Sequence, residues 1–427
     1  MEHTQVDNYD RAPVHQHWLT RQRLLIASAG FTVYAAALAA DAGGADRTWA
    51  LWAAAAYGVT TLFLLVTWRK NVPILVPLVM SMAGALAAPL VWLATRVKPT
   101  PEVQVISRSA VLLLQHGTPY LPQGQFDTWL SYNPYMPVMA VFGLPKALGA
   151  TGLIADPRIW LTAVSITLIW AAFAVAAPHR HCESCRRGVT LSTVFIAASP
   201  VIAFPLAVGI TDPPVIALMF LTLALIARPS GVTRAAAALG VACAMKATAW
   251  PAVPVLTAML AARDAAKTAW RFLGITIIVA GVLSAVTAPA ALANPYSFLQ
   301  NTVLFPLGLT KYKTPAASPL PGHLLADTGM AGHWAAVGLL AAAGAAFVVW
   351  LVIRPPRDAR AAAWRLAIGL TVMFTLAPAT RWGYFVYPIG LVAWLLLTRP
   401  PTATTGGPPV GIPAQSVGEQ AVPAGAG

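Results

Sequence analysis

Residues 73–95 read PILVPLVMSMAGALAAPLVWLAT and contain no charged side chain. An α-helix rises about 1.5 Å per residue, so about 20 such residues cross the hydrocarbon core of a bilayer. Similar apolar runs recur along nearly the whole chain, which is 58% hydrophobic and 10% charged, whereas soluble globular proteins carry about 25% charged residues. The sequence therefore predicts an all-α fold: a polytopic transmembrane helical bundle with about 10–13 membrane helices, some of them short or re-entrant.

The expected spans follow the apolar runs. They cover residues 24–42, 49–67, 73–95, 159–177, 189–208, 213–227, 272–292, 333–353, 366–380 and 383–397. Residues 134–149, which are short and broken by two prolines, are expected to form short or re-entrant helices instead of a full span. Residues 234–262 are expected to form two half-helices that meet near residues 246–250.

These spans define one expected transmembrane unit, residues 24–399. A cytoplasmic tail, 1–23, precedes it, and a tail rich in Pro and Gly, 400–427, follows it and is expected to be disordered. The first apolar run has no small-residue cleavage site behind it. It is therefore interpreted as a first span and not as a removed signal peptide.

The net charge of +14 has a topological explanation. With the N-terminus in the cytoplasm, most of the 28 Lys and Arg residues fall in inner segments, as the positive-inside rule requires. The charge therefore does not indicate nucleic-acid binding, and membrane lipids of the plasma membrane are the expected surroundings. The same topology places the loops 96–133 and 294–332 on the extracytoplasmic face.

Residues 101–122, PEVQVISRSAVLLLQHGTPYLP, interrupt the apolar pattern. An apolar stripe at helical spacing runs along this segment and consists of Val103, Ile106, Ala110, Leu113 and Leu114. Glu102 and Arg108 can face elsewhere, and the helix is expected to end at Gly117. A helix of this kind lies along a membrane surface, where it can hold a carboxylate over a lipid-accessible cavity.

Lys246, within ACAMKATAW (242–250), is an ionisable residue in an apolar segment. Such residues are costly in a membrane and usually mark function. Alternatively, Lys246 snorkels from the end of a half-helix or pairs with Asp212. Asp212 precedes two prolines at a helix start, where it acts as an N-cap or orients a substrate or a base.

Several motifs occur in a characteristic order. They are HGTPY (116–120), YNPYMPVMAVFGLP (132–145), GITDPP (209–214) and LGVACAMKATAWP (239–251). Over about residues 95–300 this order resembles the GT-C superfamily of membrane glycosyltransferases and, within it, glycosyltransferase family 87, whose members are polyprenyl-phosphate-dependent and mannosyltransferase-like. Two features depart from the family pattern: Glu102 stands where an Asp is usual, and two further spans precede the loop.

The resemblance implies a GT-C-like enzyme that transfers a sugar, mannose or a similar one, from a polyprenyl-phosphate donor to a lipid or glycan acceptor. It implies direct displacement on the extracytoplasmic face, without a cofactor. A hydroxyl is a weak nucleophile, so a carboxylate must accept its proton. Glu102 is the first candidate for this base and Asp127 the second. The alternative for both is a loop carboxylate that pairs with a nearby basic residue, Arg96, Lys98 or Arg108.

The leaving phosphate requires cations, and the sugar requires polar and aromatic partners. The expected substrate-binding residues are Arg108, His116, Tyr120, Tyr132, Asn133, Asp212, Lys246 and Arg381. No metal site is expected, because the Cys182–Cys185 pair, with His179 and His181 beside it, lacks a second Cys pair. A multi-pass transporter or lipid flippase is the alternative function, although such proteins often contain repeated halves and the sequence shows no convincing repeat.

Overall fold

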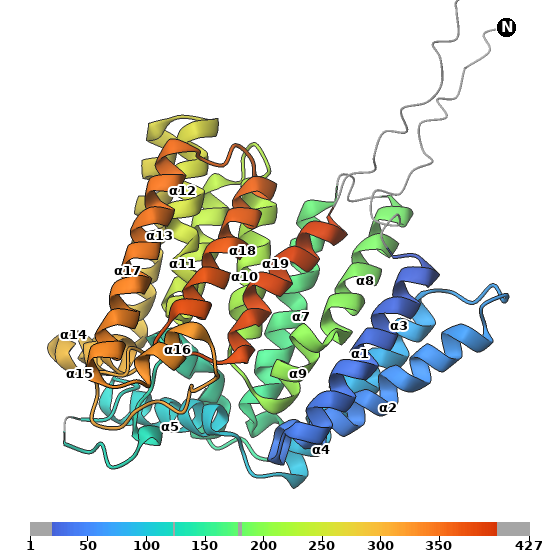
Figure 1. The fold of residues 1–427 in the computed structure, drawn as a ribbon, viewed down its shortest axis with the longest axis horizontal. Coiled ribbons are helices and arrows are strands. Elements are labelled where there is room, and N and C mark those ends of the chain that lie inside the picture. Colours follow the sequence, from blue (N-terminus) through green and yellow to red (C-terminus); the bar gives the residue numbers. More distant parts are fainter. Residues whose placement is uncertain (1–18, 123, 178–181, 399–427) are drawn as a thin grey trace, which may run out of the picture.

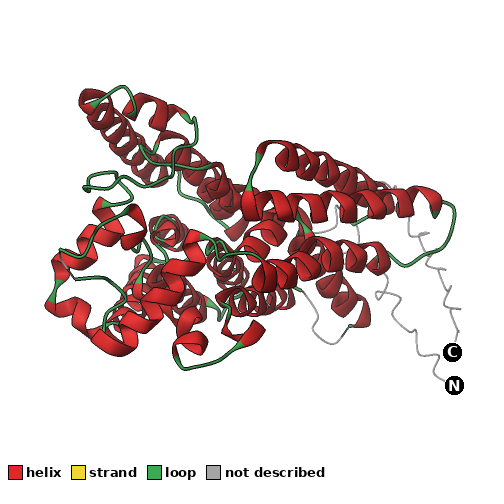
Figure 2. Ribbon diagram, turned by 90° about the horizontal axis from the view of Figure 1, so that it is seen from below, coloured by secondary structure: helices red, strands yellow, loops and turns green. Residues whose placement is uncertain are grey.

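A computed structural model describes residues 19–122, 124–177 and 182–398 as helices joined by loops (Figures 1 and 2). Seven helices in these ranges are long and apolar enough to cross a membrane. They are α1 (Arg21–Asp41), α2 (Gly44–Val66), the continuous run α3–η1–α4 (Leu75–Arg96), α7 (Pro157–Ala176), α13 (Ala266–Thr287), α17 (Met330–Ile353) and α18 (Ala359–Leu376). The predicted polytopic all-α bundle is confirmed, while the predicted tail 400–427 and residues 1–18 of the N-terminal tail lie outside the described residues.

One further pair of helices is long and apolar enough only when taken together, as a broken span or a re-entrant loop. The helices α8 (Glu183–Ala198) and α9 (Pro200–Val208) meet at 58°, because proline has no amide hydrogen with which to continue the helix. Three shorter apolar helices, α10 (Asp212–Ile226), α11 (Val232–Met245) and η7–α19 (Trp382–Leu397), complete the bundle of the described residues.

The expected pair of half-helices is present. The helix α11 ends where Lys246 adopts an extended backbone, with φ −156° and ψ 139°, and α12 (Ala252–Arg263) begins after a short 3₁₀ turn, η5 (Ala247–Ala249). The break falls at residues 246–251, as the sequence predicts. Breaking a helix at this point exposes backbone groups and a lysine to the interior of the bundle.

Residues 134–149 do not form a membrane helix. They fold into η3 (Pro137–Gly143) and the single turn α6 (Leu144–Ala147), and η4 (Gly152–Ala155) follows. The prediction of short helices in place of a full span is therefore confirmed.

One end of the bundle carries helices that lie across it, at the bottom of Figure 1. The main one is α5 (Pro101–His116), which ends at Gly117 with φ +66° as predicted. The others are η2 (Trp129–Ser131), α14 (Pro289–Ala293), α15 (Pro295–Leu299), η6 (Gln300–Leu304) and α16 (Pro321–Ala326). This end therefore closes over the membrane helices with short polar and aromatic segments.

The buried face of α5 differs from the predicted stripe. Val103, Ile106 and Ala110 are buried as expected, whereas Leu114 is 51% exposed. Glu102 lies on the buried face with 8% exposure, not away from it. The buried face is wider than the apolar stripe because the helix packs against protein, and an ion pair with a distant residue compensates the buried carboxylate.

The centre of the bundle is α10, in which every residue except Leu221 is buried. Helices on the periphery instead expose large apolar side chains: Trp270 is 71% exposed, Val286 75% and Val352 74%. Lipid tails, and not water, satisfy such a surface, so the pattern agrees with a membrane protein.

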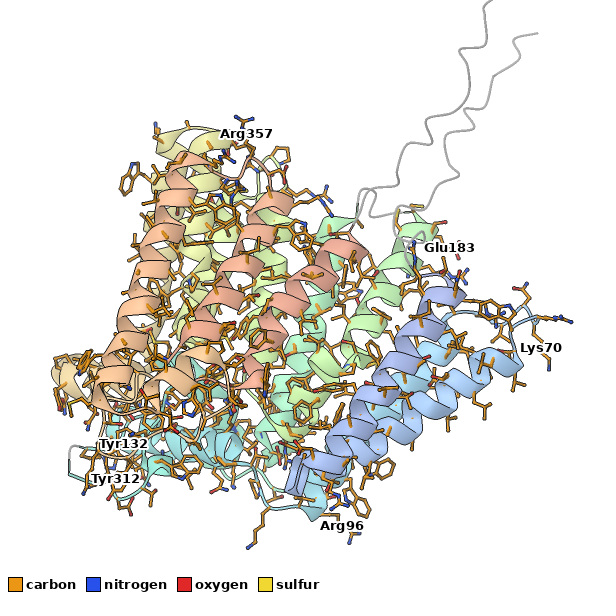
Figure 3. All side chains as sticks on the ribbon, in the orientation of Figure 1. Lys70, Arg96, Tyr132, Glu183, Tyr312 and Arg357 are labelled. Carbon is orange, nitrogen blue, oxygen red and sulfur yellow. The ribbon has the colours of Figure 1, made fainter. Side chains whose placement is uncertain are left out.

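The two ends of the bundle differ in the chain segments that they carry. In Figure 3, Arg357 and Glu183 lie toward the upper end and Lys70 lies at the right at about mid-height, whereas Arg96, Tyr132 and Tyr312 lie at the lower end. The placement of Arg96, Tyr132 and Tyr312 at one end agrees with the predicted topology, in which the loops 96–133 and 294–332 share one face.

Candidate active site

A cavity of about 580 Å³ lies at the end covered by α5. Most of its wall is apolar and comes from widely separated segments, including Val105, Val303, Phe305, Leu307, Leu340, Met373 and Phe374. The charged residues on the wall, among the described part of the chain, are Asp46, Glu102 and Arg381. The cavity therefore combines a mainly apolar wall with a small charged region.

Glu102 is held from both sides. An Nη2 atom of Arg381 donates to its Oε1 at 2.5 Å. The backbone amide of Thr211 donates to its Oε2 at 3.1 Å, and the Thr211 hydroxyl lies 3.2 Å from the same oxygen. The first turn of α5 thus brings a carboxylate to the cavity wall with a fixed orientation.

The turn that carries Thr211 approaches α5 very closely. Gly209 ends α9 with φ +93°, a left-handed conformation that suits glycine. A Cβ at this position would lie 2.3 Å from the Cγ2 of Val103 and 3.0 Å from the Cγ of Arg158. A side chain at 209 would push the turn away from α5 and separate Thr211 from Glu102.

A second ion pair lies directly behind this contact. The Nζ of Lys246 donates to Asp212 Oδ1 at 2.6 Å and to the Thr211 hydroxyl at 3.0 Å. Both side chains are nearly inaccessible, with 8% and 1% exposure. The expected pairing of Lys246 with Asp212 is therefore present, whereas the N-cap of α10 is Thr211 and not Asp212.

Thr211 connects the two ion pairs into one network. Two aromatic rings separate Lys246 from the cavity: its Nζ lies 5.5 Å from the ring centroid of Tyr135 and 5.9 Å from that of Tyr384. Tyr135 and Tyr384 line the cavity, and Lys246 does not. Lys246 consequently supports the wall from behind, and Arg381 is the cation that faces the cavity.

The electrostatic balance keeps Glu102 ionised. Burial raises the pKa of this carboxyl, but the guanidinium of Arg381, the ammonium of Lys246 and the amide of Thr211 outweigh burial and lower the pKa below its ordinary value. Burial alone would lower the pKa of Arg381, yet the carboxylate of Glu102 raises it well above its usual range. Both groups therefore carry their charges at neutral pH.

Arg381 is positioned by the short stretch before η7. Thr380 pairs with the 316–318 segment: its amide donates to Ala316 O at 2.9 Å, and its carbonyl accepts from Ser318 N at 2.9 Å. The guanidinium of Arg381 also lies 5.1 Å from the ring centroid of Tyr384. The loop 294–332 thus fixes a residue that lies far from it in the sequence.

Three of the predicted substrate-binding residues shape the cavity wall. Tyr132 lines the cavity and stacks with its ring centroid 4.5 Å from that of Phe305. Tyr120 is buried and donates to Tyr135 O at 2.9 Å. Asn133 donates to Ser109 Oγ at 2.9 Å. Tyr132 is therefore part of the wall, while Tyr120 and Asn133 hold the surrounding backbone.

The other predicted residues lie outside this network. Asp127 is exposed and accepts a 2.5 Å hydrogen bond from Ser131 Oγ in its own turn. Arg108 donates to Leu130 O at 2.6 Å and to Ser131 O at 3.1 Å. His116 is exposed at the end of α5. None of the three is part of the cavity wall, so the structure brings Glu102, Asp212, Lys246 and Arg381 together without them.

Several residues of the site did not stand out in the sequence. Thr211 precedes the expected Asp212, and Tyr135 follows the expected Asn133, so both lay within the motifs that were quoted. Asp46 gave a weaker signal: it is an acidic residue in the short connection between two spans, on the side where Glu102 was expected. Its place on the cavity wall depends on how the α1–α2 hairpin packs.

No group of three or more His, Cys, Asp or Glu residues in the described part of the chain is arranged to hold a metal ion. Cys182 and Cys185 lie at the start of α8, and His179 and His181 fall outside the described residues.

The fold and the site define a polytopic membrane protein with a charged cavity at one end of its helical bundle. The model of glycosyltransferase family 87 matches residues 133–378, more than half of the chain, and the chain belongs to this family. It is a glycosyltransferase of the GT-C type, as the resemblance implied. No curated protein and no solved structure was found to match.

Proposed function

We propose that this glycosyltransferase takes a sugar, in the first instance mannose, from a polyprenyl-phosphate donor and transfers it to a hydroxyl of a lipid or glycan acceptor. The observation that carries the proposal is the Glu102–Arg381 ion pair on the wall of a mainly apolar cavity. One carboxylate suits the acceptor hydroxyl, one guanidinium suits a phosphodiester, and the apolar wall suits an isoprenoid chain.

The contacts of Glu102 assign separate tasks to its two oxygens. Oε2 accepts from Thr211 and remains held, whereas Oε1 accepts from the guanidinium of Arg381. The Tyr135 hydroxyl also hydrogen-bonds this carboxylate. A donor phosphate competes for this guanidinium, because phosphate is a strong bidentate partner for arginine. Binding of the donor therefore frees Oε1 as the proton acceptor.

The chemical step follows from this arrangement. The acceptor oxygen forms a bond to the anomeric carbon, and the bond between that carbon and the phosphate oxygen breaks with its electron pair. The acceptor proton passes to Glu102 Oε1. The polyprenyl phosphate leaves as an anion, and Arg381 stabilises its charge.

The proposed side of the membrane is extracytoplasmic, and the proposed membrane is the plasma membrane. The basis for the side is the predicted distribution of Lys and Arg toward the other end of the bundle, an end that carries Arg357 in Figure 3.

A transfer assay in membranes tests the donor. Membranes containing the full chain are given radiolabelled polyprenyl-phosphate mannose, polyprenyl-phosphate glucose or a nucleotide sugar, and membranes with Glu102→Gln provide the background. We expect lipid-extractable product from a polyprenyl-phosphate sugar in the wild type alone. Product from the nucleotide sugar in the presence of an inhibitor of polyprenyl-phosphate sugar synthesis would refute the proposed donor.

A further inference from the structure

Asp46 is the third charged group on the cavity wall, and the transfer step described above does not use it. It lies half-buried in the first turn of α2 and lines the cavity together with Glu102 and Arg381. The α1–α2 hairpin precedes the region that the family matches. No ion pair or side-chain hydrogen bond of the described residues involves the Asp46 carboxylate, on which Arg381 acts only by electrostatic attraction through space.

The charges on the cavity wall indicate which of the two substrates contacts Asp46. A polyprenyl-phosphate sugar is a phosphodiester with one negative charge, and Arg381 is the one cation on the described wall. Donor binding therefore engages this cation. Glu102 keeps its hydrogen bonds from Thr211, with the ammonium of Lys246 behind them, whereas Asp46 is left without a hydrogen-bond donor. A carboxylate in a mainly apolar cavity is costly unless hydrogen-bond donors reach it. Asp46 consequently repels the phosphate and requires donors from the second substrate.

We propose that Asp46 is an acceptor-binding residue and that the acceptor headgroup carries several hydroxyls, as a sugar or another polyol does. This inference rests on the proposed function. One hydroxyl gives its proton to Glu102 and attacks the donor, while a neighbouring hydroxyl donates to Asp46. An acceptor with a single hydroxyl leaves Asp46 unpaired and binds more weakly.

A purely structural role for Asp46 makes a different prediction. An acidic residue in the first turn interacts favourably with the helix macrodipole, which contributes about 0.3–1 kcal/mol. Replacing it would then alter thermal stability slightly and leave ligand binding unchanged. Asp41, at the end of α1, is an exposed carboxylate of the same hairpin and supplies a matched control.

Binding to the full chain in lipid nanodiscs tests the proposal. Octyl mannoside and octyl glucoside, which carry several hydroxyls, are titrated by calorimetry alongside 1-octanol, with empty nanodiscs subtracted. The wild type, Asp46→Asn, Asp46→Glu and Asp41→Asn proteins are compared. We expect specific binding of an octyl glycoside over octanol, weakened about 10-fold or more by Asp46→Asn, partly restored by Asp46→Glu and unchanged by Asp41→Asn.

The outcomes separate the two proposals. Equal glycoside binding by wild type and Asp46→Asn, or binding no stronger than that of octanol, overturns the role of Asp46. The second measurement is transfer from polyprenyl-phosphate mannose, in which Asp46→Asn is expected to raise the acceptor KM and leave the donor KM unchanged. Glycoside binding that depends on Asp46, together with no transfer from any polyprenyl-phosphate sugar, supports the polyol site and refutes the proposed donor.

Discussion

Glu102 and Asp127 belong to the same segment, 96–133, and both were candidates for the catalytic base at the sequence level. In the structure Glu102 is 8% exposed and bound by Arg381 and Thr211, which come from distant parts of the chain. Asp127 is exposed and bound by Ser131, four residues away. A carboxylate that closes a turn needs only local partners, whereas a carboxylate held in an apolar wall needs partners that the whole fold delivers.

The pKa values of both carboxyls are low, but for different reasons. The pKa of Asp127 is lowered first by the hydrogen bond from Ser131 and then by backbone amides of its turn. The pKa of Glu102 is low although burial opposes ionisation, because Arg381 and Lys246 outweigh burial. A low pKa alone therefore does not identify a catalytic base. Which groups lower the pKa, local amides or distant cations, distinguishes the two carboxyls better.

The largest effect is expected at Glu102. A general base contributes about 10²–10⁴-fold to a rate, so Glu102→Gln should reduce transfer by that factor. Glu102→Asp keeps the charge but is shorter by one methylene group, so it should retain part of the activity. Radiolabelled transfer in membranes with matched protein levels measures both. Full activity of a folded Glu102→Gln protein would show that Glu102 is not the catalytic base.

The next effect concerns the network behind Glu102. Lys246→Met leaves the buried carboxylate of Asp212 without a cation, which costs about 3–5 kcal/mol of the free energy of unfolding. Lys246→Met/Asp212→Leu removes both charges and should recover most of that stability. Thermal unfolding in detergent is the measurement. A Lys246→Met protein with wild-type stability would show that the pair has little structural role.

Arg381 should affect both donor affinity and the dependence on pH. A charge-assisted hydrogen bond contributes about 1.5–3 kcal/mol, so Arg381→Gln should raise the donor KM roughly 10- to 100-fold, and Arg381→Lys should raise it less. Burial without the guanidinium raises the pKa of Glu102, so the acid limb of the kcat/KM profile should move to higher pH. An unchanged acid limb in a folded variant would show that Arg381 does not set the pKa of the base.

The same pKa shift has a consequence for stability. Because the pKa of Glu102 is lower in the folded than in the unfolded chain, its ionised form stabilises the fold above the unfolded pKa. This contribution is lost as pH falls through the folded pKa. Wild-type protein should therefore lose stability below the ordinary range of a glutamic acid, and Glu102→Gln should show a smaller loss over that interval.

The smallest effect is expected at Asp127. Asp127→Asn keeps a side-chain oxygen that can accept from Ser131, and the residue is remote from the cavity wall. Transfer should stay within about 2-fold of wild type, since an exposed turn residue makes no contact with the reacting groups. A loss comparable to that of Glu102→Gln would make Asp127 the base and reverse the comparison.

The sequence by itself determined the class of fold and much of its segmentation. Uninterrupted apolar runs require helices in a bilayer, and the break near Lys246 and the end of α5 at Gly117 followed from local signals. The motifs also pointed to a family 87 glycosyltransferase, and the family match confirms it. These features depend on neighbours in the chain, so local pattern was sufficient.

Only the tertiary structure decided which polar residues form the site. The pairing of Glu102 with Arg381 joins residues 279 positions apart, and Asp46 reaches the same cavity from the first hairpin. The buried face of α5 also departed from its apolar stripe, because a cation from a distant loop compensates the carboxylate. Such contacts arise from how helices pack against one another, and helical periodicity carries no information about which distant partner arrives.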